Sequence, residues 1–164
     1  AAYCTMSNGQ TVQAANVWSA GLPYLTPVES FGDTLAPDYE TQVTFTPQEL
    51  SQAVAAAWPQ LTLEGDPAGW LEQAARSPSG YVTQVRLGEG LTVHGKELRA
   101  ALGLRSADFD LGWDGQAFTF TVRGYGHGVG FSQYGADYMA RQGATFDEIL
   151  AHYYPGSTLA MAAA

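Results

Sequence analysis

The 164-residue sequence is poor in basic residues. Seven Lys and Arg residues face 16 Asp and Glu residues, so the formal net charge is −9. The basic residues are dispersed along the chain and form no stripe, which argues against a nucleic-acid partner. A surface of this sign also repels anionic lipid headgroups. No apolar run reaches the roughly 18 residues of a membrane span, so we expect none in this chain.

Cysteine is almost absent, which limits the redox and metal chemistry. The single cysteine, Cys4, cannot form an internal disulfide or supply a four-ligand zinc site alone. The three histidines, His94, His127 and His152, are widely spaced and form no H-E-x-x-H motif. Cys4 and His127 would share a metal only if the chain ends met, and a small buried apolar role for Cys4 is favoured. We therefore predict no metal and no cofactor.

Glycine, by contrast, is concentrated in one segment. Residues 124–136 read GYGHGVGFSQYGA, with five glycines around one histidine. Glycine at every second position weakens a strand, but it permits tight bends and close approach of a ligand or a second backbone. The pattern predicts a bent backbone around His127, a side chain suited to proton transfer near neutral pH. A His127 that only ties a turn through backbone hydrogen bonds is an equally open alternative.

Ser132 and Gln133 follow the glycines at the start of an expected helix. Ser132 is predicted to be the N-cap of that helix. A serine nucleophile is disfavoured, because it needs a base and an orienter and no G-x-S-x-G elbow is present. Arg105 could orient an anionic or acetamido group, or could pair with Asp108 or Asp110.

Aromatic residues gather in the two end segments of the chain. They are Trp18, Tyr24, Tyr125, Tyr134, Tyr138, Tyr153 and Tyr154. Aromatic faces with nearby hydroxyls and amides suit sugar rings, and a tyrosine-rich core is the alternative.

Helix and strand signals alternate along the sequence and predict an α+β fold. Capping and apolar periodicity indicate helices over residues 47–57, 67–76, 96–102, 132–142 and 146–153. Short alternating runs indicate strands over residues 43–45, 81–87, 91–94, 109–111 and 117–122. We expect a single domain over residues 1–164. Its cleft-forming core comes from both chain ends, residues 1–40 and 108–164, with an inserted helix-plus-hairpin subdomain at 41–107.

The glycine-rich segment, taken with Arg123, resembles the signature of the SpoIID/LytB domain family (stage II sporulation protein D). The match continues in register through Met139-Ala140, Gly143, Glu148-Ile149-Leu150 and His152-Tyr153-Tyr154-Pro155-Gly156. Similar matches occur at Ser7-Asn8-Gly9-Gln10-Thr11, Asn16-Val17-Trp18, Pro23-Tyr24-Leu25 and Leu102-Gly103-Leu104-Arg105-Ser106. The resemblance covers nearly the whole chain.

This resemblance implies peptidoglycan chemistry in the bacterial cell envelope or in the space between forespore and mother cell. Family members are extracytoplasmic lytic transglycosylases or companions of cell-wall amidases. The enzymes cleave the MurNAc–GlcNAc linkage of strands that lack stem peptides and leave a 1,6-anhydro sugar. By this resemblance Tyr125 and His127 line the floor of the cleft in supporting catalytic roles. The implied substrate-binding residues are Tyr24, Arg105, Ser132, Gln133 and Tyr134.

One departure from the family concerns the catalytic acid. The family's acid is a Glu in a small-residue helix of an N-terminal segment, and nothing in this chain matches it. Protonating a glycosidic oxygen requires a carboxylic acid beside the bond. The chain begins Ala1-Ala2-Tyr3 without Met or a visible signal peptide, so we expect a fragment or processed product.

We therefore expect this chain to bind glycan strands without cutting them, with the Glu in a preceding segment. Its expected partners are glycan strands and other cell-wall hydrolases. The alternative is a non-catalytic wall-binding module or amidase enhancer.

Overall fold

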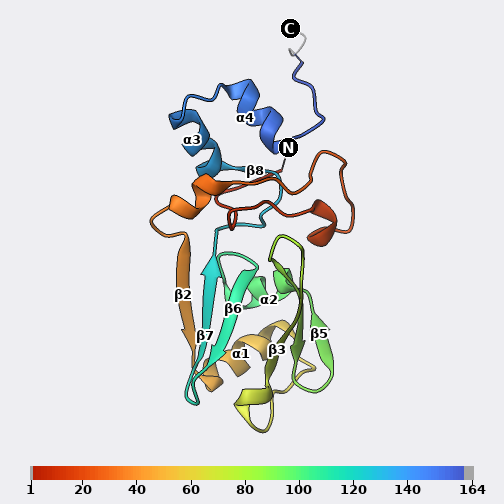
Figure 1. Ribbon diagram of the computed structural model, residues 1–164. Coiled ribbons are helices and arrows are strands. Elements are labelled where there is room, and N and C mark those ends of the chain that lie inside the picture. Colours follow the sequence, from red (N-terminus) through yellow and green to blue (C-terminus); the bar gives the residue numbers. More distant parts are fainter. Residues whose placement is uncertain (1, 161–164) are drawn as a thin grey trace. The chain divides into compact units, whose positions relative to one another are not determined.

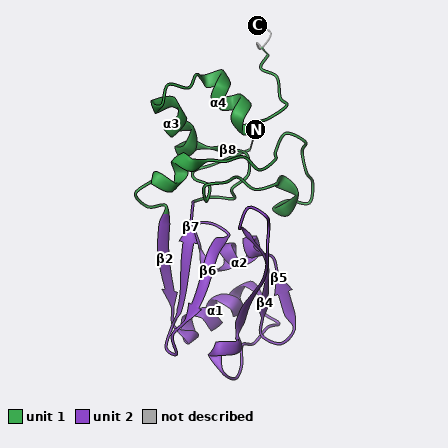
Figure 2. Cartoon of the chain, in the orientation of Figure 1, with its two compact units in different colours: residues 1–39, 125–164 green, residues 40–124 purple. Residues whose placement is uncertain are grey.

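The structure is a computed structural model that describes residues 2–160 (Figure 1). Both helices and strands are present, which confirms the α+β class. The chain divides into two compact units, residues 1–39 with 125–164 (unit 1) and residues 40–124 (unit 2), as Figure 2 shows. Unit 2 extends beyond the insertion expected at residues 41–107, because a strand at residues 118–123 pairs with the first strand of the unit and a strand at residues 108–113 pairs with that later strand.

Unit 2 contains two antiparallel sheets of three strands each. The first has the order β2 (Glu40–Phe45), β7 (Phe118–Arg123), β6 (Asp108–Trp113). The second has the order β3 (Leu71–Arg76), β4 (Val82–Leu87), β5 (Leu91–Val93). The Asp114-Gly115 turn joins β6 to β7, and the Asp114 carboxylate accepts the N–H groups of Gln116 and Ala117 at 2.8 Å. That contact explains why this dipeptide predicts the hairpin.

Two helices complete unit 2 and share one core with its sheets. Helix α1 (Pro47–Ala57) begins at the predicted Thr46 capping box, and α2 (Gly95–Leu102) ends at Gly103 in the left-handed region. The fully buried side chains of this core include Leu50, Val54, Val82, Val85, Leu98, Phe109 and Phe120. These residues come from both helices and both sheets, so burial of one shared apolar surface stabilises the whole unit.

The helix predicted over residues 67–76 is wrong. Only a 3₁₀ turn, η3 (Pro67–Gly69), forms there, and Asp66 caps it by accepting the Ala68 N–H at 3.0 Å. Strand β3 follows directly and pairs with β4 along its length. Leu71 at its start is buried opposite Leu87, so long-range pairing outweighs the local helix signal.

Unit 1 brings the two ends of the chain together with little regular structure. Strand β1 (Tyr3–Cys4) pairs in parallel with β8 (Phe131–Ser132). Helices α3 (Gln133–Arg141) and α4 (Phe146–Tyr153) confirm the two helices predicted at residues 132–142 and 146–153. The N-terminal part adds the 3₁₀ turns η1 (Ala14–Asn16) and η2 (Phe31–Leu35), and η2 packs against α3. Within residues 2–160, no helix is both long and apolar enough to cross a membrane.

Candidate functional site

The N-terminal segment holds the glycine-rich loop, which we define as residues 124–131. Met6 and Tyr125 exchange two backbone hydrogen bonds, with N···O distances of 3.0 and 2.8 Å. Farther along the loop, the Val12 N–H donates to the Gly128 carbonyl at 2.8 Å. Met6 and Val12 are buried, so these bonds are shielded from water. The loop is therefore a fixed platform rather than a free connection.

The glycines of the loop are required by its geometry. All four alternating glycines have positive φ, as the sequence pattern predicts. A Cβ on Gly126 would lie 2.9 Å from the Cβ of Cys4, and a Cβ on Gly130 would overlap the carbonyl of Ala2. That carbonyl also accepts the Phe131 N–H at 3.0 Å. Close contact between the two ends of the chain thus excludes side chains at these positions.

His127 lies half-buried in the middle of the loop. Its Nδ1 accepts the N–H of Val129 at 3.0 Å, so the neutral ring carries its proton on Nε2. The ring centroid lies 5.0 Å from that of Trp18, with an angle of 59° between the planes. The hydrogen bond from Val129 matches the structural alternative for His127, in which the ring stabilises a turn through a backbone hydrogen bond. Because it occupies Nδ1 alone, it is compatible with chemistry at Nε2.

The other predicted site residues differ in their exposure. Tyr125 and Tyr134 are 45% and 40% exposed, and Gln133 is exposed beside Tyr134 at the start of α3. Tyr24 is half-buried, with its ring edge-on to that of Tyr154 at a centroid distance of 6.0 Å. Unit 1 therefore presents three predicted side chains that can contact a ligand directly.

Arg105 belongs to unit 2, in the connection after α2. Asp108 and Asp110, its predicted alternative partners, form ion pairs with Arg76 and Arg123. These contacts raise the pKa of Arg123, first through its hydrogen bond to Asp110.

Ser132 is fully buried and does not face a ligand. Its Oγ donates to Oδ1 of Asp33 at 2.6 Å and accepts the Gly135 N–H at 3.4 Å. The predicted N-cap role is confirmed. Burial removes the direct substrate contact that the resemblance implied for Ser132, and the side chain supports the loop from within.

Asp33 is a buried residue that the sequence reasoning missed. Its Oδ2 accepts the backbone N–H of Ser7 at 2.8 Å and the Ser7 hydroxyl at 2.5 Å. An acidic side chain rarely lies fully buried unless hydrogen bonds satisfy it, and Asp33 has no exposure. Its donors lie 26 and 99 residues away in the chain, so no local pattern identifies it.

A second buried polar contact lies beside Gly135 of α3. The hydroxyls of Ser30 and Tyr153 are 2.6 Å apart, and Tyr153 has no exposure. Burial raises the pKa of Tyr153 to about 12, against a smaller lowering by the bond to Ser30. Tyr153 is therefore a neutral hydrogen-bonding residue at physiological pH and no proton donor to a ligand.

Unit 1 has shallow hollows near α3. One of about 250 Å³ is lined by Gly32, Leu35, Ala36, Pro37, Tyr134, Asp137, Tyr138 and Arg141. Tyr134 thus faces a concave surface that is partly aromatic and partly charged. A concave surface with a few polar groups is the usual form of a ligand site.

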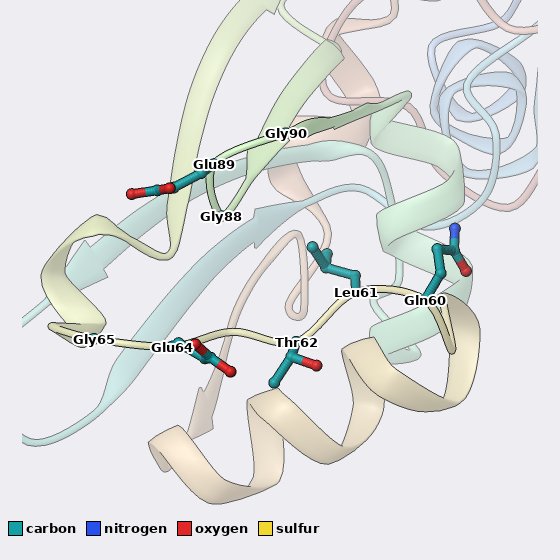
Figure 3. Close-up of a pocket in the computed structure, with 8 residues that line it drawn as sticks. All are labelled: Gln60, Leu61, Thr62, Glu64, Gly65, Gly88, Glu89 and Gly90. Atoms are coloured by element: carbon teal, nitrogen blue, oxygen red, sulfur yellow. The ribbon is translucent and has the colours of Figure 1, made fainter.

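Unit 2 has a hollow of about 630 Å³ between the segment after α1 and the β4–β5 turn (Figure 3). Its lining residues are Gln60, Leu61, Thr62, Glu64, Gly65, Gly88, Glu89 and Gly90. None of the predicted site residues lines it. The close-up shows Glu89 on the turn and Glu64 on the facing segment, so carboxylates flank the hollow and disfavour anionic ligands there.

Residues 2–160 contain no group of three or more His, Cys, Asp or Glu side chains placed to hold a metal ion. Cys4 is 4% exposed and packs under Gly126. Its burial fits the apolar role that the sequence favoured.

Comparison with known proteins identifies the family. No family model matches the chain. It is 37% identical over 162 residues to stage II sporulation protein D of Bacillus subtilis (strain 168), which covers 99% of this chain and 45% of that protein. For the protein of the same name from Bacillus amyloliquefaciens, identity is 40% over 156 residues, covering 95% of this chain and 43% of the relative. The chain is a domain of the stage II sporulation protein D family.

This family domain spans less than half the length of those two relatives. It is also similar to the amidase enhancer of Bacillus subtilis (strain 168), with 27% identity over 209 residues that cover 97% of this chain and 29% of that protein. The names of these relatives refer to sporulation and to enhancement of an amidase.

Proposed function

We propose that unit 1 binds glycan strands of peptidoglycan outside the cytoplasm. The chain would form part of a lytic transglycosylase that cleaves the MurNAc–GlcNAc linkage to a 1,6-anhydro product. The observation that carries this proposal is the clamped glycine-rich loop, which holds His127 beside Trp18 and leaves Tyr125 exposed. Aromatic faces next to polar groups suit sugar rings, whose faces stack and whose edges form hydrogen bonds.

The exposed side chains have distinct roles in this proposal. Tyr125 offers a ring face and a hydroxyl, and the neutral His127 ring offers an Nε2–H donor to a sugar oxygen. Gln133 and Tyr134 hold sugar substituents at the start of α3. As a separate proposal for unit 2, Arg105 orients an acetamido or anionic group. A rigid backbone favours binding, because little conformational freedom remains to be lost when the glycan docks.

The acid comes from elsewhere in this proposal. Cleavage requires a carboxylic acid that protonates the glycosidic oxygen. The bond between C1 of MurNAc and this oxygen breaks, and the C6 hydroxyl of the same MurNAc attacks C1. The carboxylate left by the acid takes the hydroxyl proton as the 1,6-anhydro ring closes. Asp33 accepts a hydrogen bond from Ser132, directly after the loop, but it is fully buried and hydrogen-bonded to two serines, so it cannot reach a glycosidic oxygen. We assign the acid to a Glu in another segment of the same polypeptide.

Two assays test the proposal. The 164-residue chain should bind chitotetraose or denuded glycan strands in calorimetry and release no product. A longer protein that includes the acid-bearing segment should release anhydro-ended fragments, identified by mass spectrometry. Products with only reducing ends would exclude a transglycosylase. Turnover by the 164-residue chain alone would exclude an external acid.

The similarity to an amidase enhancer supports a second candidate, a non-catalytic module that stimulates a cell-wall amidase. In that case the chain should accelerate release of stem peptides when it is added to an amidase and intact peptidoglycan. No anhydro ends should form with the longer protein either. A His127→Asn variant provides a control, because stimulation that depends on the loop should fall with it.

A further inference from the structure

We propose that Asp33 is the positioning residue of the glycine-rich loop. Its single buried carboxylate fixes both ends of the loop and thereby sets the places of Tyr125 and His127. The part of this inference that concerns ligand affinity rests on the proposed glycan binding. The part that concerns the loop is independent of any ligand.

The first end of the loop is held through Ser7. Oδ2 of Asp33 accepts both the N–H and the hydroxyl of Ser7, at 2.8 and 2.5 Å. Ser7 directly follows Met6, which exchanges two backbone bonds with Tyr125. The carboxylate therefore holds the residue next to the partner of Tyr125.

The second end is held through Ser132, by the other carboxylate oxygen. Oδ1 of Asp33 accepts the Ser132 hydroxyl at 2.6 Å. Ser132 ends β8, is aligned with Cys4 in β1, and caps α3. The Asp33 side chain thus joins the N-terminal segment, η2 and the start of α3. Through Ser7 and Ser132 it holds a residue near each end of the loop.

The site is built for a charged carboxylate rather than an amide. Buried ionised oxygens need several donors, and Asp33 receives three hydrogen bonds. The first turn of α3 adds its positive end, since a Cβ on Gly135 would lie 3.4 Å from Oδ1. An Asn side chain would keep one acceptor oxygen and present an NH₂ group to donors on the other side.

The experiment compares Asp33→Asn with the matched control Ile149→Val, which thins buried packing in α4 without touching the network. Hydrogen exchange and the His127 ring signals are followed by NMR in the free protein. Asp33→Asn should speed exchange of the Met6 and Tyr125 amides by about tenfold or more and shift the His127 signals. The control should leave both unchanged, and amides of unit 2 should be unaffected in either variant. Equal effects of the two variants on the loop would overturn the inference.

A second pair of variants keeps the test open if Asp33→Asn does not fold. Ser7→Ala should loosen the loop mainly at Tyr125, and Ser132→Ala mainly at Phe131. The same local response from both variants, or none, would contradict separate anchoring by the two carboxylate oxygens.

Affinity for chitotetraose separates this inference from the proposed function. Asp33→Asn should weaken binding by about tenfold, whereas Ile149→Val should not. If the unaltered chain does not bind chitotetraose, the proposed glycan binding is wrong. The hydrogen-exchange data still test whether Asp33 positions the loop. Unchanged affinity in a variant with a loosened loop would refute positioning for binding.

Discussion

The rings of His127 and Trp18 lie with their centroids 5.0 Å apart and their planes at 59°. Trp18 belongs to the N-terminal part of the chain, whereas the loop lies more than 100 residues later. Trp18 is 37% exposed. The bond from the Val129 N–H to Nδ1 fixes the other side of the His127 ring. The pair therefore combines a partly exposed indole with an imidazole whose Nδ1 is held by the loop backbone, and aromatic faces beside polar groups suit sugar rings.

The first prediction separates a binding role for His127 from a structural one. His127→Asn keeps an oxygen that can accept the Val129 N–H two residues on, but it removes the ring beside Trp18. We expect the melting temperature to change by only about 2–4 °C. Affinity for chitotetraose should fall by about tenfold, as for loss of one hydrogen bond and ring contact. Calorimetry and thermal scans measure both quantities.

His127→Ala is the companion variant, because it removes the acceptor as well. It should bind as weakly as His127→Asn and be somewhat less stable. A large loss of stability with unchanged affinity would assign His127 a structural role only.

The second prediction concerns Gly130. It has φ of +75°, and an added Cβ would overlap the Ala2 carbonyl, so Gly130→Ala combines backbone strain with a collision. Gly143 is a matched control, with φ of +96° and no atom within 4 Å of an added Cβ. We expect Gly130→Ala to reduce the free energy of unfolding by about 3 kcal/mol and Gly143→Ala by about 1 kcal/mol. Urea unfolding measures the difference, and equal losses would mean that the chain ends do not meet as described.

Local signals in the sequence were sufficient for the elements that begin at a capping residue. Thr46 with Glu49 and Thr145 with Glu148 form capping boxes within four residues, and both helices start where the pattern predicts. Ser132 is the predicted cap of α3 for the same reason. These contacts depend only on neighbours in the chain, so the sequence displays them directly.

Long-range contacts explain what the sequence did not reveal. Residues 71–76 form a strand because β4 pairs with them, not because of their own composition. Asp33 is buried because Ser7 and Ser132 converge on it from distant positions. The glycine spacing predicted the bent loop, but the burial of Ser132 and its hydrogen bond to Asp33 depend on distant residues and were not predicted.

The third prediction concerns alkaline pH. The pKa of Tyr153 is raised from 10.0 to about 12 by burial, so the folded state holds this proton more tightly than the unfolded state. The stabilisation is fully present below pH 10 and is lost as the pH rises toward 12. Tyr153 should steepen the fall in unfolding free energy over that range by up to about 1.4 kcal/mol per pH unit.

Tyr153→Phe tests this assignment. The variant loses the hydrogen bond to Ser30, so it should be less stable by about 1 kcal/mol at neutral pH. Its stability should also decline less steeply above pH 10 in urea titrations. If the unfolding free energy of the variant fell as steeply above pH 10 as that of the unaltered protein, Tyr153 would not be the source of the alkaline pH dependence.

The fourth prediction concerns salt. The chain carries a formal charge of −9, and a denuded strand carries a lactyl carboxylate on each MurNAc unit, whereas chitotetraose is neutral. The screening length falls from about 30 Å at 0.01 M salt to about 10 Å at 0.1 M. As salt rises from about 0.01 M to about 0.1 M, affinity for denuded strands should therefore increase by roughly threefold or more, while affinity for chitotetraose stays constant.

Arg105→Gln tests whether Arg105 attracts the lactyl carboxylates of denuded strands against the repulsion from the negatively charged chain. If Arg105 holds an anionic substituent, the variant should weaken binding of denuded strands and leave binding of chitotetraose unchanged. Arg86→Gln is a matched control, because it removes the same charge at an exposed pair with Glu72 that lies outside the predicted site residues. Affinity for denuded strands that falls with added salt would show that local attraction outweighs the net charge. An equal effect of the two arginine variants would leave Arg105 as one charge among seven basic residues rather than a specific contact.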